Sequence, residues 1–145
     1  MIVELIMKKF IVLFVLVLIV FACNKNDEVK VELFSPEAFC YSLDSGWELN
    51  ASVNVKGFKQ EEKNGIFESK ISYSVDLMTP GNNIKSGIFK DVIDKKNNEK
   101  IMDIALECQV VLDSTYEKGD YTIIFNVKDE LSGKTKDINK TFKVE

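Results

Sequence analysis

The chain has 145 residues with only two prolines, 46% hydrophobic and 29% charged residues, which is the composition of one folded domain and not of a disordered protein. All 19 of its basic residues are lysines, 23 residues are acidic, and the net charge is −4, with no arginine and no histidine. The lack of histidine excludes imidazole catalysis, Ser-His and Cys-His nucleophiles and His-ligated zinc, and the acidic balance argues against nucleic acid as a partner.

The chain begins with a short basic and apolar segment. Lys8 and Lys9 precede the twelve uninterrupted apolar residues 10–21, and Ala22 and Cys23 follow. Because roughly 20 apolar residues are needed to span a bilayer, this length is typical of the hydrophobic region of a signal peptide. An uncleaved membrane anchor and a buried amino-terminal helix are the two alternatives.

The end of this segment resembles the signal sequence of bacterial lipoproteins. In that family an aliphatic, a variable and a small residue precede an invariant cysteine, and Val20, Phe21, Ala22 and Cys23 occupy these four positions. The resemblance implies cleavage before Cys23, diacylglycerol on its thiol, and usually a further acyl chain such as palmitate on the new amino terminus.

The resemblance also divides the chain. Residues 1–22 would be the signal peptide, residues 23–28 the lipidated cysteine and a short polar tether, and residues 29–145 the folded domain. The lipid on Cys23 would hold the protein in the bacterial cell envelope, at the outer membrane, facing either the periplasm or the cell surface.

From residue 29 onward, apolar and polar residues alternate with a period of two, which predicts β-strands. One polar and one apolar face per strand is typical of antiparallel sheets packed around a shared core. We therefore expect an all-β fold, a single antiparallel β-sandwich of about seven or eight strands, preceded only by the hydrophobic signal helix. The expected strands cover residues 29–33, 47–55, 67–77, 84–93, 102–112, 121–127 and 138–144.

The stretch LDSTYEKGDYTIIFNVKD, residues 112–129, resembles the carboxy-terminal half of an immunoglobulin-like domain. Gly119 and Tyr121 match the Gly-x-Tyr that precedes the penultimate strand of such domains. The resemblance implies that Tyr121 is the corner tyrosine, whose hydroxyl bonds to upstream backbone while its ring enters the core. The alternative is an ordinary inward-facing strand tyrosine. Trp47 follows Cys40 too closely for the cysteine–tryptophan pair of antibody domains, so only the general immunoglobulin-like class is implied.

Apart from the lipidated cysteine, Cys40 and Cys108 remain as a candidate disulfide in an oxidising compartment. A bridge would close a loop of about 70 residues and stabilise the fold by about 4 kcal/mol in the chain-entropy model. Cys108 faces inward by alternation. Phe39, Tyr41 and Leu43 have the opposite phase to Cys40. Cys40 therefore faces inward only if the chain bends after Pro36. Two separate buried thiols are the alternative.

No group of residues in the sequence indicates a particular reaction, metal or cofactor. The aromatic residues Trp47, Phe58, Tyr73 and Tyr116 are candidates for a glycan-stacking platform, although the phase of Trp47 favours a structural role in the core. We expect a non-enzymatic envelope lipoprotein whose sandwich binds another envelope protein or a glycan. The alternatives are a small-ligand or glycan-binding lipoprotein and, third, an accessory domain of a hydrolase.

Overall fold

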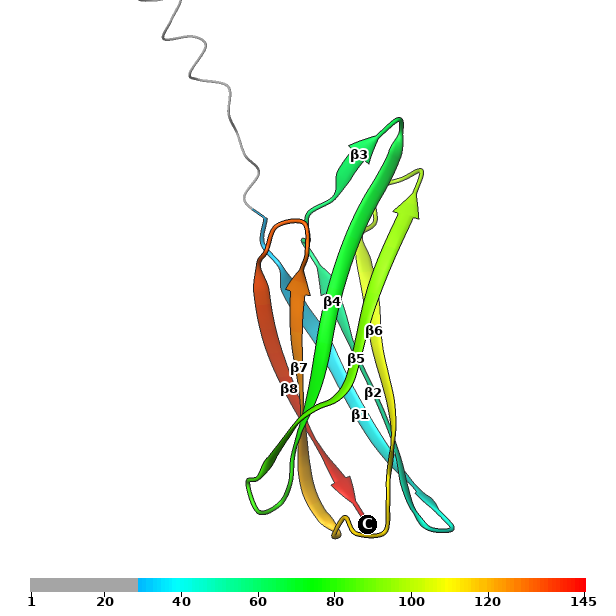
Figure 1. Ribbon diagram of the computed structural model, residues 1–145, viewed down its shortest axis with the longest axis vertical. Coiled ribbons are helices and arrows are strands. Elements are labelled where there is room, and N and C mark those ends of the chain that lie inside the picture. The colour runs from blue at the N-terminus through cyan, green and yellow to red at the C-terminus, as the bar shows by residue number, and fades with distance from the viewer. Residues whose placement is uncertain (1–28) are drawn as a thin grey trace, which may run out of the picture.

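The computed structural model describes residues 29–145, which form eight β-strands and no helix (Figure 1). The all-β class predicted from the alternation is therefore confirmed for the described residues, whereas the expected signal helix lies outside them. In chain order the strands are β1 Glu32–Leu43, β2 Gly46–Lys56, β3 Glu61–Lys63, β4 Ile66–Met78, β5 Ile84–Asn97, β6 Asp103–Leu112, β7 Gly119–Asp129 and β8 Thr135–Val144.

The strands form two antiparallel sheets that pack face to face as a β-sandwich (Figure 1). The three-stranded sheet has the order β1-β2-β6. The five-stranded sheet has the order β3-β4-β7-β8, and β5 pairs with the edge of β4 opposite β7. The chain crosses between the sheets after β2, after β5 and after β6, so neither sheet is built from one continuous run of sequence.

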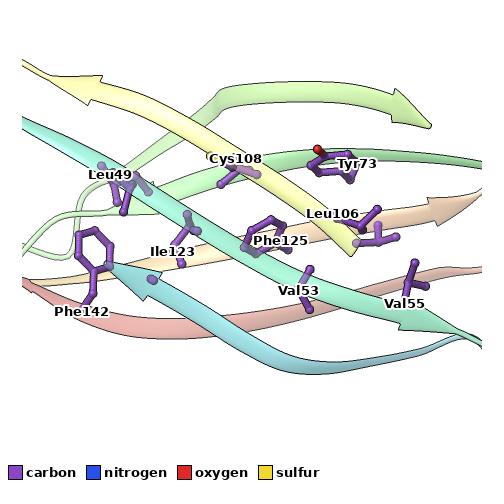
Figure 2. Close-up of a cluster of buried hydrophobic side chains, with 14 of the residues drawn as sticks. Leu49, Val53, Val55, Tyr73, Leu106, Cys108, Ile123, Phe125 and Phe142 are labelled. Atoms are coloured by element: carbon purple, nitrogen blue, oxygen red, sulfur yellow. The ribbon is translucent and has the colours of Figure 1, made fainter. Parts of the chain in front are cut away.

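The core lies between the inner faces of the two sheets. Leu49, Val53 and Val55 of β2 are fully buried, and the polar residues that alternate with them point outward. Ile123 and Phe125 of β7 meet them from the other sheet (Figure 2). Since each fully buried aliphatic or aromatic side chain stabilises the fold by about 1.5–3 kcal/mol, this alternation specifies which face of each strand turns inward.

Every expected strand overlaps an observed one, but the opening strand differs in its bounds and one further strand is present. The opening strand begins at Glu32 instead of Val29 and continues to Leu43, well beyond the expected end. The short strand β3 was not expected, because three polar residues carry no alternation signal. It forms a hairpin with the start of β4 through a turn at Asn64 and Gly65, both of which have positive φ.

A β-bulge in β1 reverses the inward and outward positions of that strand. Phe34 pairs with Asn54 of β2, but the next pair joins Glu37 to Ser52, so β1 contains one extra residue between them. Ser35 in the bulge has a φ of 51°. Before the bulge odd-numbered residues face the core, and after it even-numbered residues do. Hence Ala38 is buried, whereas Phe39, Tyr41 and Leu43 are exposed.

The described chain starts at one end of the sandwich. The β7–β8 turn and β3 lie at this same end, and the β1–β2 turn, the β6–β7 loop and the carboxyl end lie at the opposite end (Figure 1). A chain running along β1 therefore passes from one end of the molecule to the other.

Candidate functional site

Cys23, the expected lipidation site, lies outside the described residues 29–145. Within those residues no helix is long and apolar enough to cross a membrane, and no group of three or more potential metal ligands gathers.

Tyr121 lies at the start of β7 with its ring fully buried. Its hydroxyl donates a hydrogen bond of 2.7 Å to the carbonyl oxygen of Glu117, four residues upstream. This is the contact that the corner role requires. The ring lies between those of Tyr116 and Phe142, with centroid distances of 6.4 and 5.9 Å. Burial, and then the nearby Glu117 carboxylate, raise the pKa of Tyr121 above its usual value.

Trp47 is half-buried at the edge of the core, where it pairs across the strands with Ser42 and Leu112. The other aromatic residues proposed for a glycan platform do not join it on the surface. Phe58 and Tyr73 are buried, and the ammonium of Lys85 lies 3.8 Å from the ring centroid of Tyr116. Trp47 therefore has a mainly structural position, and the four aromatic residues form no common exposed platform.

The two cysteines of the sandwich are free thiols. Cys40 lies in β1 and Cys108 in β6, and β2 runs between these strands. Since neighbouring strands are about 4.8 Å apart, the two Cα atoms are separated by about 10 Å or more, beyond the reach of a disulfide. The described residues therefore hold the alternative arrangement of two separate thiols, Cys108 buried and Cys40 half-buried. Burial raises the pKa of Cys108 to about 11.

The outer face of the three-stranded sheet carries exposed apolar residues that alternation alone assigns to the core. Their side chains lie in regular cross-strand rows, because directly paired residues of antiparallel strands point to the same side. Leu43 pairs with Gly46 next to the β1–β2 turn, and three rows that cross all three strands follow. They are Tyr41 with Glu48 and Val111, Phe39 with Asn50 and Gln109, and Glu37 with Ser52 and Glu107. The only sequence signal for this face was the possible bend after Pro36.

The outer face of the five-stranded sheet has a different character. It contains a shallow open depression of about 800 Å³. Hydroxyl, amide, ammonium and carboxylate groups line it, including those of Ser72, Ser74, Lys90, Asn126 and Asp137. Some of the neighbouring polar groups are already paired: Asn126 donates to the Asp76 carboxylate and Ser72 to the Glu130 carboxylate. The depression is shallow, and hydrogen-bonding groups lie in it among apolar surface atoms.

The chain matches no protein-family model and no curated protein.

Proposed function

We propose that the protein is a lipoprotein of the bacterial cell envelope, anchored in the outer membrane by acyl chains on Cys23, and that its β-sandwich is a non-catalytic binding module. One observation carries the proposal. Lys8 and Lys9, twelve apolar residues, Ala22 and Cys23 follow one another in the order of a lipoprotein signal, and Cys23 lies six residues before Val29.

The proposal includes an immunoglobulin-like class for the sandwich. If β3 is left aside and β5 is lettered C′ because it pairs with β4, the strands read A, B, C, C′, E, F and G in chain order. The three-stranded sheet is then A-B-E and the other sheet is C′-C-F-G. This order is close to the immunoglobulin arrangement, in which A, B and E share one sheet and C, F and G the other. The bond from the Tyr121 hydroxyl to Glu117, at the start of the strand lettered F, supports the same class.

A binding role agrees with the chemistry of the chain. Without histidine and arginine, the sequence lacks the side chains most often used for proton transfer and for clamping phosphate at neutral pH. Sandwich domains offer sheet faces, edges and end loops to partners, although that link is an analogy from fold.

The anchor would also orient the domain. Residues 23–28 span at most about 20 Å when extended, so the end of the sandwich that holds Val29 would stay near the lipid surface. The opposite end, with the β1–β2 turn, would face away from the membrane (Figure 1).

Acyl labelling tests the anchor. The full chain is expressed in a Gram-negative host supplied with alkynyl palmitate, and the purified protein is analysed by mass spectrometry. We expect label on the wild type, none on Cys23→Ala, and undiminished label on the matched control Cys40→Ser. If Cys23→Ala keeps the label and the membrane association, the lipoprotein proposal is wrong. Crosslinking in cells that carry the acylated protein then identifies what the module binds.

A second candidate, a lipoprotein that binds a glycan or another small polar ligand, is favoured by the hydrogen-bonding groups in the depression on the five-stranded sheet. A titration with a panel of envelope oligosaccharides, followed by amide chemical shifts, tests it. Saturable shifts of Ser74, Asn126 and Asp137 would support this function, and shifts spread without saturation over the whole surface would exclude it.

A further inference from the structure

Four large apolar side chains near the β1–β2 turn are exposed to solvent. The exposed fractions are 54% for Phe39, 57% for Tyr41, 43% for Leu43 and 64% for Val111. All four point outward from the three-stranded sheet, in adjacent rows of its lattice. We call this group the hairpin patch. Exposed apolar residues that gather in one place mark contact sites, whereas scattered ones do not.

Carboxylates lie between and beside the apolar residues of the hairpin patch. Glu48 lies between Tyr41 and Val111, and Glu37 and Glu107 occupy the row beyond Phe39. No lysine among residues 29–145 forms an ion pair with any of these three carboxylates. Any group that covers the patch therefore meets negative charge that the domain itself leaves uncompensated.

This charge is specific to one side of the molecule. The outer face of the three-stranded sheet has five carboxylates and one lysine, and that lysine, Lys56, pairs with Glu32 at the end far from the patch. The outer face of the five-stranded sheet has six of each. The six carboxylates there are Glu61, Glu68, Asp76, Asp94, Asp120 and Asp137, and the six lysines are Lys63, Lys70, Lys90, Lys96, Lys128 and Lys143. The domain is thus charge-balanced on one face and acidic on the other.

The edge strand beside the patch also lacks the charges that usually guard a sheet edge. Lysines and inward-pointing charges on edge strands prevent contact with other chains. Both edges of the five-stranded sheet have them, with Lys85, Lys90 and Asp91 on β5 and Lys136, Lys140 and Lys143 on β8. In β1 the residues from Ala38 to Leu43 carry no charge. This part of β1 therefore lacks the charges that protect the edges formed by β5 and β8.

We propose that the hairpin patch and its three carboxylates form a docking surface for a basic, partly apolar segment of a partner protein. Lysine or arginine side chains of the partner would place their charged ends at Glu37, Glu48 and Glu107, and their aliphatic stems and neighbouring apolar residues would cover Phe39, Tyr41 and Val111. A second copy fits less well, because two copies meeting through this face would bring three uncompensated carboxylates against three. The inference rests on the proposed binding role and names the partner chemistry.

Peptide binding to the full-length protein in dodecyl maltoside micelles tests the docking surface. The probe is a fluorescein-labelled twelve-residue peptide of alternating lysine and valine, and its anisotropy is measured at 50 and 150 mM salt. Two control peptides replace every lysine by glutamate or every valine by serine. We expect saturable binding of the lysine–valine peptide, weaker at the higher salt, and binding at least tenfold weaker for both controls.

Two sets of variants locate the contact. We expect the triple change Glu37→Lys, Glu48→Lys and Glu107→Lys to weaken binding at least tenfold. The matched control Glu61→Lys, Asp94→Lys and Asp120→Lys alters net charge equally on the other face, outside the depression, and should change affinity less than twofold. The double change Phe39→Ser and Tyr41→Ser leaves net charge unaltered and should also weaken binding at least tenfold, with circular dichroism checking that each variant is folded.

Three results would overturn the proposal. Equal losses in the two triple variants would mean that only net charge matters. Equal binding of the glutamate–valine peptide would mean that the carboxylates do not select the partner. A dimer that dissociates in the Phe39→Ser and Tyr41→Ser variant would make a second copy the occupant. Acylation of Cys23 is measured in a separate labelling experiment. A result against the lipid anchor can therefore be distinguished from a result against the docking surface.

Discussion

The Asp129 carboxylate accepts a hydrogen bond of 2.8 Å from the backbone N–H of Lys59, which lies seventy residues earlier in the chain. Asp129 is completely buried at the end of β7. It also accepts hydrogen bonds from the backbone N–H groups of Leu131 and Ser132 and from the Ser132 hydroxyl. One carboxylate thus shapes the β7–β8 turn and fastens the β2–β3 connection to it, at the end of the sandwich that holds Val29.

The Asp129→Ala variant should lower the free energy of unfolding by about 3 kcal/mol, because it leaves several buried N–H donors without an acceptor. Urea denaturation followed by tryptophan fluorescence measures the change. Asp137→Ala, an exposed aspartate on β8, is the matched control and should cost less than about 0.5 kcal/mol. Equal losses in the two variants would contradict the role given to Asp129.

Tyr73 joins the two sheets through its hydroxyl, which donates a hydrogen bond of 2.5 Å to the carbonyl oxygen of Glu107 in β6. Tyr73→Phe should therefore cost about 1 kcal/mol at pH 8, measured by urea denaturation. Ser69→Ala serves as a comparison, because the buried Ser69 hydroxyl has no hydrogen-bond partner in the structure and its loss should cost less. A smaller loss for Tyr73→Phe than for Ser69→Ala would contradict this role.

The stability difference between wild type and Tyr73→Phe should depend on pH. Burial, and then the nearby Asp91 carboxylate, raise the pKa of Tyr73 to about 12 from the ordinary 10.0. The folded state therefore holds this proton more tightly than the unfolded state. The stabilisation is complete below about pH 10 and is lost as the pH rises towards 12, so the advantage of the wild type should narrow over that range. Lysine titration affects both proteins alike, and a constant difference would contradict the raised pKa.

Gly46 at the β1–β2 turn has no room for a side chain. A Cβ atom there would lie 2.2 Å from the backbone carbonyl oxygen of Leu112, and the residue has a φ of 119°. Gly46→Ala should lower the free energy of unfolding by more than about 2 kcal/mol. Gly65→Ala, at another positive φ but with open space around it, should cost only about 1 kcal/mol. Thermal unfolding compares them, and a larger loss for Gly65→Ala would contradict this account.

Thiol alkylation should distinguish the two cysteines of the sandwich. In the Cys23→Ala variant without reductant, two thiols should react with iodoacetamide after denaturation. In the folded protein at pH 8, the half-buried Cys40 should react first, because burial raises the pKa of Cys108 to about 11 and hides its sulfur. Mass spectrometry of tryptic peptides gives the rates. Two unreactive thiols under denaturing conditions would instead reveal a bridge.

The strands of the sandwich could be predicted because the inner and outer faces differ so strongly in polarity. In β2, β4, β6 and β7 nearly every inward position is apolar, so the period of two is visible without any knowledge of pairing. The Tyr121 contact could also be anticipated, because Gly119 and Tyr121 form a local pattern. The depression on the five-stranded sheet could not, because its residues come from four strands that are distant in sequence.

The face of β1 could not be predicted from alternation. Phe39, Tyr41 and Leu43 have the spacing of a core-facing set, and only the pairing of Glu37 with Ser52 reveals the extra residue before them. Alternation records the period of a strand but not the side on which it begins. The cysteines show the same limit, since the position of β2 between Cys40 and Cys108 depends on strand order.

The bulge at Ser35 and Pro36 decides which side chains of β1 form the exterior of this protein. If the same chain paired regularly with β2 from Phe34 onward, Phe39, Tyr41 and Leu43 would turn towards the core, while Ala38 and Cys40 would face the solvent. Deleting Ser35 or Pro36 would instead remove the extra residue and leave the segment from Glu37 to Leu43 paired as it is. An adhesive surface and an inert one thus differ here by a slip of one residue in strand register, without the replacement of any amino acid.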